Sequence, residues 1–378
     1  MSKEITWTQE KKTSFQEDLL TWYRLEKRDL PWRESTDPYR VWVSEIMLQQ
    51  TQVVTVIPYF NRFMEWFPTI EALANANEDK LLKAWEGLGY YSRVRNMQHA
   101  AKEIVKTFDG KMPNKIEDIL SLKGVGPYTG GAIGSIAFSL PEPAIDGNVM
   151  RVYSRLFCLA DDIALPKTRK VFDRYVRDTM SQSEPGDFNQ ALMDLGATIC
   201  TPTKPSCETC PIQAYCEAKK TNTISKYPVK KKKEKAKPLY YVADILQNDT
   251  GAFLLEKRPS DGLLADMWTF PMREVTKKDY DRFSQIYDSH DVSTGMVAEQ
   301  LNLYDEVENI KDKNLLGIVT HIFSHRKWHI LVVQDKLNGL KDTHLTNQKW
   351  VYLDEFPQYV FPKPQQKMVE LLKKSMNN

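Results

Sequence analysis

The chain has 378 residues, 42% of them hydrophobic, which is enough for two domains with packed cores. No stretch approaches the roughly 18 uncharged apolar residues of a membrane span, and residues 1–10 lack the apolar run of a secretory signal. We therefore expect a soluble cytoplasmic protein, and its net charge of +2 argues only weakly for a nucleic-acid partner.

The positive charge is concentrated in one short segment. Residues 1–225 carry 28 Lys and Arg against 29 Asp and Glu, residues 239–378 carry 17 against 20, and residues 226–238 carry seven lysines and one glutamate. A block of like charge with a proline near each end is typical of a solvated linker. The pattern predicts a first domain over 1–225, a basic linker over 226–238 and a second domain over 239–378.

The first domain has an almost entirely helical periodicity over 8–225. Asp37 and Pro38 predict a helix start before 39–50, and Pro58 predicts a kink in a helix over 51–66. Further helices are expected at 78–86, 92–108, 115–121, 128–139, 147–160, 167–180 and 187–198.

The second domain has a different pattern. Stretches rich in β-branched, aromatic and aliphatic residues predict strands at 239–247, 252–257, 315–322 and 328–334, and a last helix is expected at 363–374. The fold class expected for the whole chain is therefore a mainly α part followed by an α+β domain.

A glycine-rich turn over 122–129 separates two of the expected helices. Gly124 and Gly126 permit a tight turn whose backbone N–H groups can point at a phosphate, supported by the positive end of the next helix. Such a helix-hairpin-helix contacts the DNA backbone without reading its sequence. A plain turn between helices fits the same residues.

Two carboxyl side chains are candidates for acid–base chemistry. Asp146 precedes the helix expected at 147–160, where an aspartate commonly serves only as a helix cap. Glu45 lies on a predicted helix, where a glutamate is usually solvated. Its neighbours Trp42, Ile46 and Met47 would partly desolvate it, which raises the pKa of a carboxyl group and suits a proton donor.

Four of the five cysteines fall within 17 residues, with the spacing C-x6-C-x2-C-x5-C. The odd total argues against a disulfide framework. Cys200, Cys207, Cys210 and Cys216 can ligate zinc or a [4Fe–4S] cluster, and their spacing mildly favours the cluster.

Together these motifs resemble the DNA glycosylases related to endonuclease III, and within them the adenine-glycosylase branch. The resemblance covers roughly 10–225 strongly. The segments that carry it, besides the hairpin and the cysteines, are LPWR at 30–33, SEIMLQQTQ at 44–52, GLGYY at 87–91 and FNQALMDLG at 188–196.

The resemblance implies an enzyme that removes adenine mispaired with 8-oxoguanine or guanine in double-stranded DNA, acts as a monomer and carries a [4Fe–4S] cluster. It assigns Glu45 to protonating the flipped adenine, Asp146 to stabilising the positive sugar, and Tyr128 and Asn148 to assisting there. The matching adenine-pocket positions are Trp32, Arg33, Leu48 and Gln190. Gln50, Thr51, Leu88 and Tyr90 match residues that fill the gap in the duplex or touch the opposite base.

Tyr128 bears on strand cleavage. Glycosylases that also cut the strand need an amine to form a Schiff base with the sugar, and the endonuclease III branch has a lysine where this chain has Tyr128. We therefore expect hydrolysis with little lyase activity, although Lys123 lies nearby in the sequence. A strand-cutting endonuclease III-type enzyme, a non-catalytic iron–sulfur DNA-binding module and a redox carrier are the alternatives.

The second domain weakly resembles the Nudix-like part of adenine glycosylases that reads 8-oxoguanine. Phe323, Ser324 and His325 lie between two expected strands, as in the family's sensor loop, although a plain hairpin would look the same. Residues 268–271 resemble part of a Nudix domain, but no glutamate-rich metal box follows. This domain is therefore expected to bind nucleotides rather than hydrolyse them.

Overall fold

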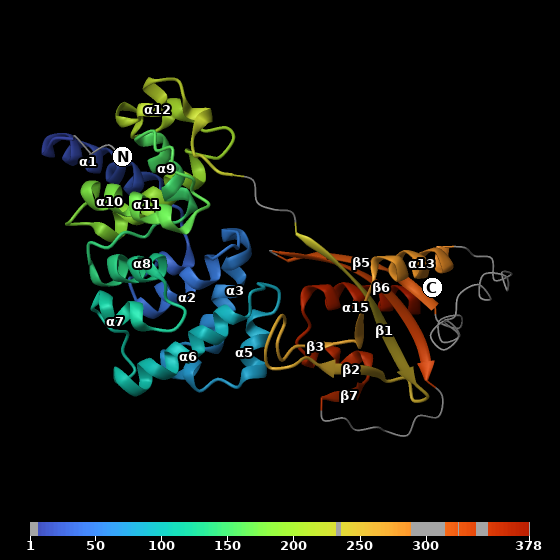
Figure 1. Cartoon of the computed structure of the whole chain (residues 1–378). Coiled ribbons are helices and arrows are strands. Elements are labelled where there is room, and N and C mark those ends of the chain that lie inside the picture. The colour runs from blue at the N-terminus through green and yellow to red at the C-terminus, as the bar shows by residue number, and fades with distance from the viewer. Residues whose placement is uncertain (1–6, 232–235, 289–313, 324, 338–346, 378) are drawn as a thin grey trace. The chain divides into compact units, whose positions relative to one another are not determined.

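The computed structural model describes residues 7–231, 236–288, 314–323, 325–337 and 347–377, which divide into two compact units (Figure 1). Unit 1 comprises residues 1–84 and 92–232, and unit 2 comprises 85–91 and 233–378. The division at 232/233 falls within the basic segment 226–238. No helix in the described ranges is both long enough and apolar enough to cross a bilayer.

Unit 1 is built from helices, as the periodicity predicts. Its α-helices are α1 (Gln9–Glu26), α2 (Pro38–Leu48), α3 (Val53–Trp66), α4 (Ile70–Ala74), α5 (Glu78–Trp85), α6 (Ser92–Thr107), α7 (Ile116–Ser121), α8 (Pro127–Phe138), α9 (Gly147–Leu156), α10 (Arg169–Thr179), α11 (Pro185–Thr198) and α12 (Glu217–Lys220). The last residue of α5, Trp85, is grouped with unit 2.

Local sequence signals explain several helix ends. The Asp37 carboxylate accepts a hydrogen bond from Arg40 N at the start of α2, and Pro58 lies inside α3. The helix expected over 147–160 ends earlier, at Leu156, because the backbone becomes left-handed at Cys158 (φ 51°). Neither glycine nor proline marks that turn.

Helices distant in sequence pack together in unit 1. Helix α2 packs against α8, while α11 packs against α1, α8 and α9. One buried cluster joins α1, α9, α10 and α11, with Phe15, Tyr153, Phe172 and Phe188 fully buried in it. Helix α11 is therefore central to the packing that brings the predicted site residues together.

Unit 2 contains a mixed sheet with the order β3-β2-β1-β6-β5, in which β4 pairs with β1 and β7 with β2. The strands are β1 (Lys237–Asn248), β2 (Phe253–Lys257), β3 (Trp268–Thr269), β4 (Met272–Val275), β5 (Asn314–Ile322), β6 (Arg326–Leu337) and β7 (Gln348–Val351). Strands β1 and β6 are parallel, and β5 and β6 are antiparallel. The α+β prediction is confirmed.

A helix covers each face of this sheet. Ile330 and Val332 of β6 pack in a cluster with α15 (Lys363–Met376), whereas the alternating Leu331 and Val333 pack with α13 (Lys277–Asp288). Successive residues of a strand point to opposite faces, so β6 contributes to two apolar layers.

Candidate active site and iron–sulfur loop

Glu45 is buried in unit 1 in spite of its charge. It lies on α2, whose residues from Val41 to Met47 are all buried, and only 6% of its surface is exposed. The Tyr128 hydroxyl on α8 donates a hydrogen bond to Glu45 Oε2 at 2.5 Å. Burial raises the pKa of Glu45 to about 7, and the Asp146 charge adds to this, while the Tyr128 hydrogen bond and the Arg33 charge oppose it.

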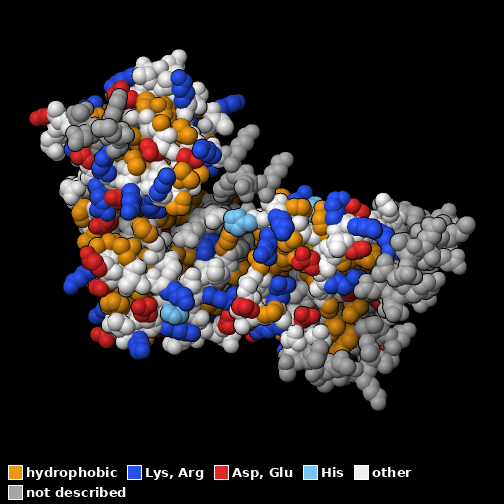
Figure 2. Space-filling view, in the orientation of Figure 1, with side chains coloured by type: hydrophobic (Ala, Val, Ile, Leu, Met, Phe, Trp, Pro, Cys, Tyr) orange, Lys and Arg blue, Asp and Glu red, His pale blue; other side chains and the backbone are white. Residues whose placement is uncertain are grey.

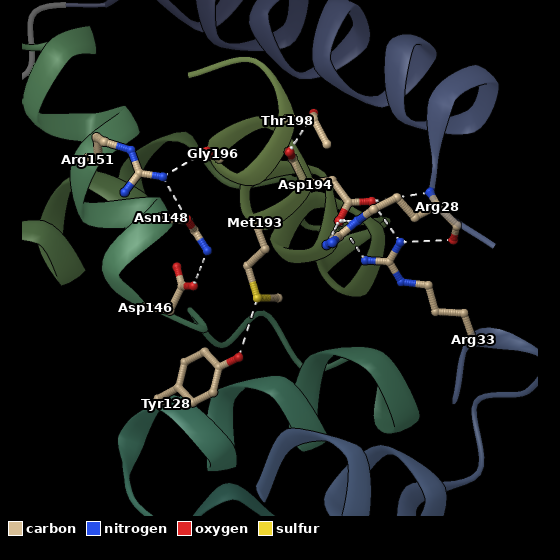
Figure 3. Close-up of polar contacts among 10 residues, drawn as sticks. All are labelled: Arg28, Arg33, Tyr128, Asp146, Asn148, Arg151, Met193, Asp194, Gly196 and Thr198. Carbon is tan, nitrogen blue, oxygen red and sulfur yellow. Dashed lines mark hydrogen bonds and ion pairs between the residues drawn. The ribbon is translucent and has the colours of Figure 1, made fainter. Parts of the chain in front are cut away.

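Asp146 is held by the start of α9. Its carboxylate accepts a hydrogen bond from Asn148 Nδ2 at 2.7 Å (Figure 3). It accepts a second one from Val149 N at 2.8 Å. Burial raises the pKa of Asp146, and these two hydrogen bonds oppose the rise because they favour the ionised form. Capping the helix therefore also orients this carboxylate.

All four predicted adenine-pocket residues line one pocket together with Glu45. Its space, together with the open solvent at its mouth, is about 460 Å³, and its lining residues are Arg28, Leu30, Trp32, Arg33, Val41, Ser44, Glu45, Leu48, Val53, Tyr128, Ile136, Gln190 and Met193. Trp32, Arg33, Leu48 and Gln190 are all among them. The Tyr128 hydroxyl donates its hydrogen bond to Glu45, and the Asp146 charge also acts on Tyr128.

The hairpin glycines have different surroundings. Gly124 has a left-handed backbone (φ 83°), and a Cβ there would lie 2.8 Å from Asn96 Cβ. Gly126 is the N-cap residue that precedes α8, and a Cβ there would meet no atom within 4 Å. The first glycine is therefore required by the turn itself, whereas the second leaves open space in front of the helix N-terminus.

The remaining predicted DNA-contacting residues are not brought to this pocket. Gln50, with a left-handed backbone (φ 58°), and Thr51 follow α2, and neither lines the pocket. Leu88 is buried and Tyr90 is 47% exposed, and both are grouped with unit 2.

In the second unit, the predicted sensor loop connects β5 and β6. The Phe323 ring lies 4.5 Å from the His321 ring and 4.8 Å from the Trp328 ring, measured between centroids. Its backbone N–H donates to Arg326 O, and His325 is exposed. Ser324 lies outside the described residues.

The four clustered cysteines line one hollow, together with Arg155, Ile199 and Lys219 among others. Within the described ranges, no group of three or more His, Cys, Asp or Glu side chains is arranged to hold a single metal ion. A [4Fe–4S] cluster is bound through an iron at each of four corners. Four thiols that line one hollow fit this four-point ligation.

Several functional contacts escaped the sequence reasoning because they join distant parts of the chain. Arg151 donates to Gly196 O and to Asn148 Oδ1 at 2.7 Å each (Figure 3). It also donates to Cys200 O at 2.7 Å. Gly196 permits this approach, since a Cβ there would lie 2.5 Å from Asn148 Cβ. The cysteine loop is thereby linked to the residue that orients Asp146.

Comparison with known proteins agrees with this geometry. Residues 43–178 match the HhH-GPD superfamily of base excision DNA repair proteins, 200–216 match the iron–sulfur binding domain of endonuclease III, and 242–371 match the NUDIX domain. An adenine DNA glycosylase of Buchnera aphidicola subsp. Schizaphis graminum is 32% identical, over 95% of this chain and 99% of its own length. The chain belongs to the adenine DNA glycosylase family.

Two further relatives extend the comparison. An adenine DNA glycosylase of Arabidopsis thaliana is 35% identical over 85% of this chain, which spans 57% of that protein's length. The structure of a thermostable thymine-DNA glycosylase is 28% identical with a TM-score of 0.51, covering 56% of this chain and 98% of its own. The protein is therefore a DNA N-glycosylase of base excision repair, and its cysteine loop holds a [4Fe–4S] cluster.

Proposed function

We propose that this family member removes adenine paired with 8-oxoguanine or guanine by hydrolysis, and leaves an abasic site with little strand cleavage. It acts as a monomer on double-stranded DNA in the cytoplasm, at the nucleoid. The observation that carries the proposal is the buried Glu45 in a pocket that Trp32, Leu48 and Gln190 also line.

Glu45 is the proposed acid. A carboxyl whose pKa is about 7 is protonated in a large fraction of molecules at neutral pH, so it can donate a proton to the base. A protonated adenine is a better leaving group, and it reaches the pocket only after leaving the base stack. Tyr128 positions the Glu45 carboxyl through their hydrogen bond, and Gln190, which lines the same pocket, binds the edge of the base.

Asp146 is the proposed stabiliser of the sugar. The glycosidic bond breaks through an oxocarbenium-like transition state, and a nearby carboxylate lowers its energy. The hydrogen bonds from Asn148 and Val149 favour the ionised form of Asp146. Water then attacks the sugar, because the tyrosine at position 128 cannot form the Schiff base on which strand cleavage depends.

The substrate test uses labelled duplexes carrying adenine opposite 8-oxoguanine, adenine opposite guanine, or an oxidised thymine. We expect adenine release, with strand cleavage appearing only after alkali. Cleavage of the thymine-lesion strand without alkali would instead identify a strand-cutting enzyme of the endonuclease III type.

The catalytic assignment is tested with Glu45→Gln. This variant should lose adenine excision while still binding the mismatch, because the amide fills the same space but has no acidic proton to give. Near-normal excision by Glu45→Gln would show that another group is the acid.

The preference for 8-oxoguanine is assigned to residues 323–325. Phe323 can wedge into a base stack, and Ser324 or His325 can hydrogen-bond an oxidised purine. The double variant Ser324→Ala/His325→Ala should therefore act on adenine opposite guanine as before and lose its preference for 8-oxoguanine. An unchanged preference would place the sensor elsewhere.

A further inference from the structure

A buried carboxylate, Asp194 on α11, binds two arginines at the edge of the pocket. Only 1% of its side chain is exposed. Arg33 donates to both of its oxygens, at 2.7 and 3.0 Å, and Arg28 donates through Nε at 2.9 Å and also through Nη2. Figure 3 shows both guanidinium groups converging on this one side chain.

Both arginines line the same pocket as Glu45. Besides burial, the pKa of Glu45 is shifted by Tyr128 on α8, by Asp146 before α9 and by Arg33. The residues that α3 and α11 contribute to the pocket lining, Val53, Gln190 and Met193, are uncharged. Arg33 therefore acts on Glu45 directly, and Asp194 binds both Arg33 and Arg28, the second arginine of the pocket lining.

The arginines and Glu45 have opposing electrostatic requirements. A nearby guanidinium favours the ionised form of a carboxyl, and the Arg33 charge already lowers the pKa of Glu45 against the effect of burial. Burial also raises the pKa of Asp194, but the hydrogen bonds and charges of Arg33 and Arg28 outweigh this and lower it. Asp194 therefore carries a negative charge that offsets one of the two positive charges.

We propose that Asp194 is a positioning residue that holds Arg28 and Arg33 and compensates their charge, so that Glu45 keeps its proton at neutral pH. This inference rests on the proposed role of Glu45 as the acid. A purely structural role for Asp194 would anchor α11 to the 28–33 segment without affecting the protonation of Glu45.

The test is the pH dependence of single-turnover adenine release by the full-length protein, using the adenine:8-oxoguanine duplex. Excision requires protonated Glu45, so the rate should fall as pH rises through about 7 in the wild-type protein. Asp194→Asn keeps the shape of the side chain and removes its charge. The fall should then occur at lower pH, by roughly one unit, which makes the rate above the transition about tenfold lower.

Two further variants separate charge from folding. Arg33→Met in the Asp194→Asn background should move the fall back towards higher pH, because it removes an uncompensated charge. Arg28→Met alone removes one positive charge and leaves the pair of Arg33 and Asp194. In this variant the rate should fall at a higher pH than in the wild type. Asp281→Asn breaks an exposed ion pair with Lys277 in unit 2 and serves as the matched control, with an unshifted profile.

Different results would contradict the role of Asp194 and the role of Glu45 as the acid. If Asp194→Asn lowers the rate equally at every pH and leaves the pH of the fall unchanged, the inference is overturned. If Asp194→Asn does not fold, an unchanged pH of the fall in Arg28→Met overturns it instead. If Glu45→Gln excises adenine normally, or the wild-type rate shows no fall near neutral pH, the acid assignment itself fails.

Discussion

At the scale of single residues, Glu45 places a carboxyl where an ionised group is costly. Its pKa of about 7 lies above the ordinary 4.5 because burial penalises the charged form. A group whose pKa is higher in the folded than in the unfolded state binds more protons in the folded state. The protein is therefore destabilised as pH rises from about 4.5 to about 7.

Glu45→Gln should consequently stabilise the protein at pH 8. The rise of the Glu45 pKa by about 2.5 units corresponds to about 3 kcal/mol of unfolding free energy at 1.36 kcal/mol per unit. This gain in stability should vanish near pH 4, where Glu45 is neutral in the folded protein and largely neutral in the unfolded chain. Urea unfolding of both proteins at pH 4 and pH 8 measures it. A variant no more stable than wild type at pH 8 would show that the Glu45 pKa is not raised.

Arg155 on α9 is a buried cation whose partners lie in the cysteine loop and the segment after it. Only 2% of its surface is exposed. It donates to Cys200 Sγ at 3.2 Å, to Thr201 O at 2.8 Å, to Pro202 O at 3.0 Å and to Tyr227 O at 3.1 Å. None of these partners is a carboxylate, so the negative charge of the thiolate-bound cluster is the natural counter-charge for this guanidinium.

Arg155→Met should therefore weaken retention of the cluster. We expect less iron per purified chain and faster bleaching of the cluster's visible absorption under oxygen than in the wild type. Arg177→Met, which removes a more exposed arginine from α10, is the control and should retain normal iron. Equal iron content and bleaching rates in both variants would leave Arg155 as a structural residue only.

At the scale of elements, the chain leading to Asp146 is fixed by a close approach of α8. A Cβ at Gly131 would lie 2.1 Å from Pro143 O and 2.7 Å from Pro143 C. From the other side, the Asn189 side chain on α11 accepts a hydrogen bond from Ala144 N and donates to Glu142 O. Helices α8 and α11 together thus position the segment that ends at Asp146, the proposed stabiliser of the sugar.

Gly131→Ala should shift that segment. Overpacking a buried contact with backbone costs about 1–3 kcal/mol, and excision should fall along with stability because Asp146 moves. Gly147→Ala is the matched control for the thermal unfolding measurement, because a Cβ there meets no atom within 4 Å. If Gly131→Ala unfolds at the same temperature as Gly147→Ala, the approach of α8 is looser than the structure indicates.

Signals confined to a few neighbouring residues were predictable from the sequence. The helix starts at Asp37 and Asp146 follow from caps that bond three residues ahead, and the four longest strands carry enough apolar residues to be recognised. Strands β3, β4 and β7 were missed because each has only two to four residues. The Arg33–Asp194 pair was also missed, since its members are 161 residues apart in sequence and only packing of α11 brings them together.

At the scale of the whole molecule, each unit has its own buried core. Unit 1 is organised around the cluster centred on α9, α10 and α11, and unit 2 around two clusters on the faces of its sheet. On the face shown in Figure 2, Lys and Arg side chains gather over α10 and α11 with acidic side chains among them. With a net charge of only +2, attraction to DNA depends on where the basic side chains lie rather than on their total.

The basic segment between the units offers a way to separate their roles. Seven lysines within residues 226–238 make it a dense target for trypsin. We expect brief digestion to yield two main fragments, with the cluster absorption in the N-terminal one, because residues 200–216 lie there. Mass spectrometry of the products identifies the cut.

The purified N-terminal fragment should still release adenine, because Glu45, Asp146 and every lining residue of the pocket precede the cut. Its preference for 8-oxoguanine over guanine should fall towards that of the Ser324→Ala/His325→Ala variant, because residues 323–325 are lost. Uncut protein carried through the same steps without trypsin is the control. A fragment that keeps the full preference would place recognition of the opposite base in unit 1, where Gln50 and Thr51 follow α2.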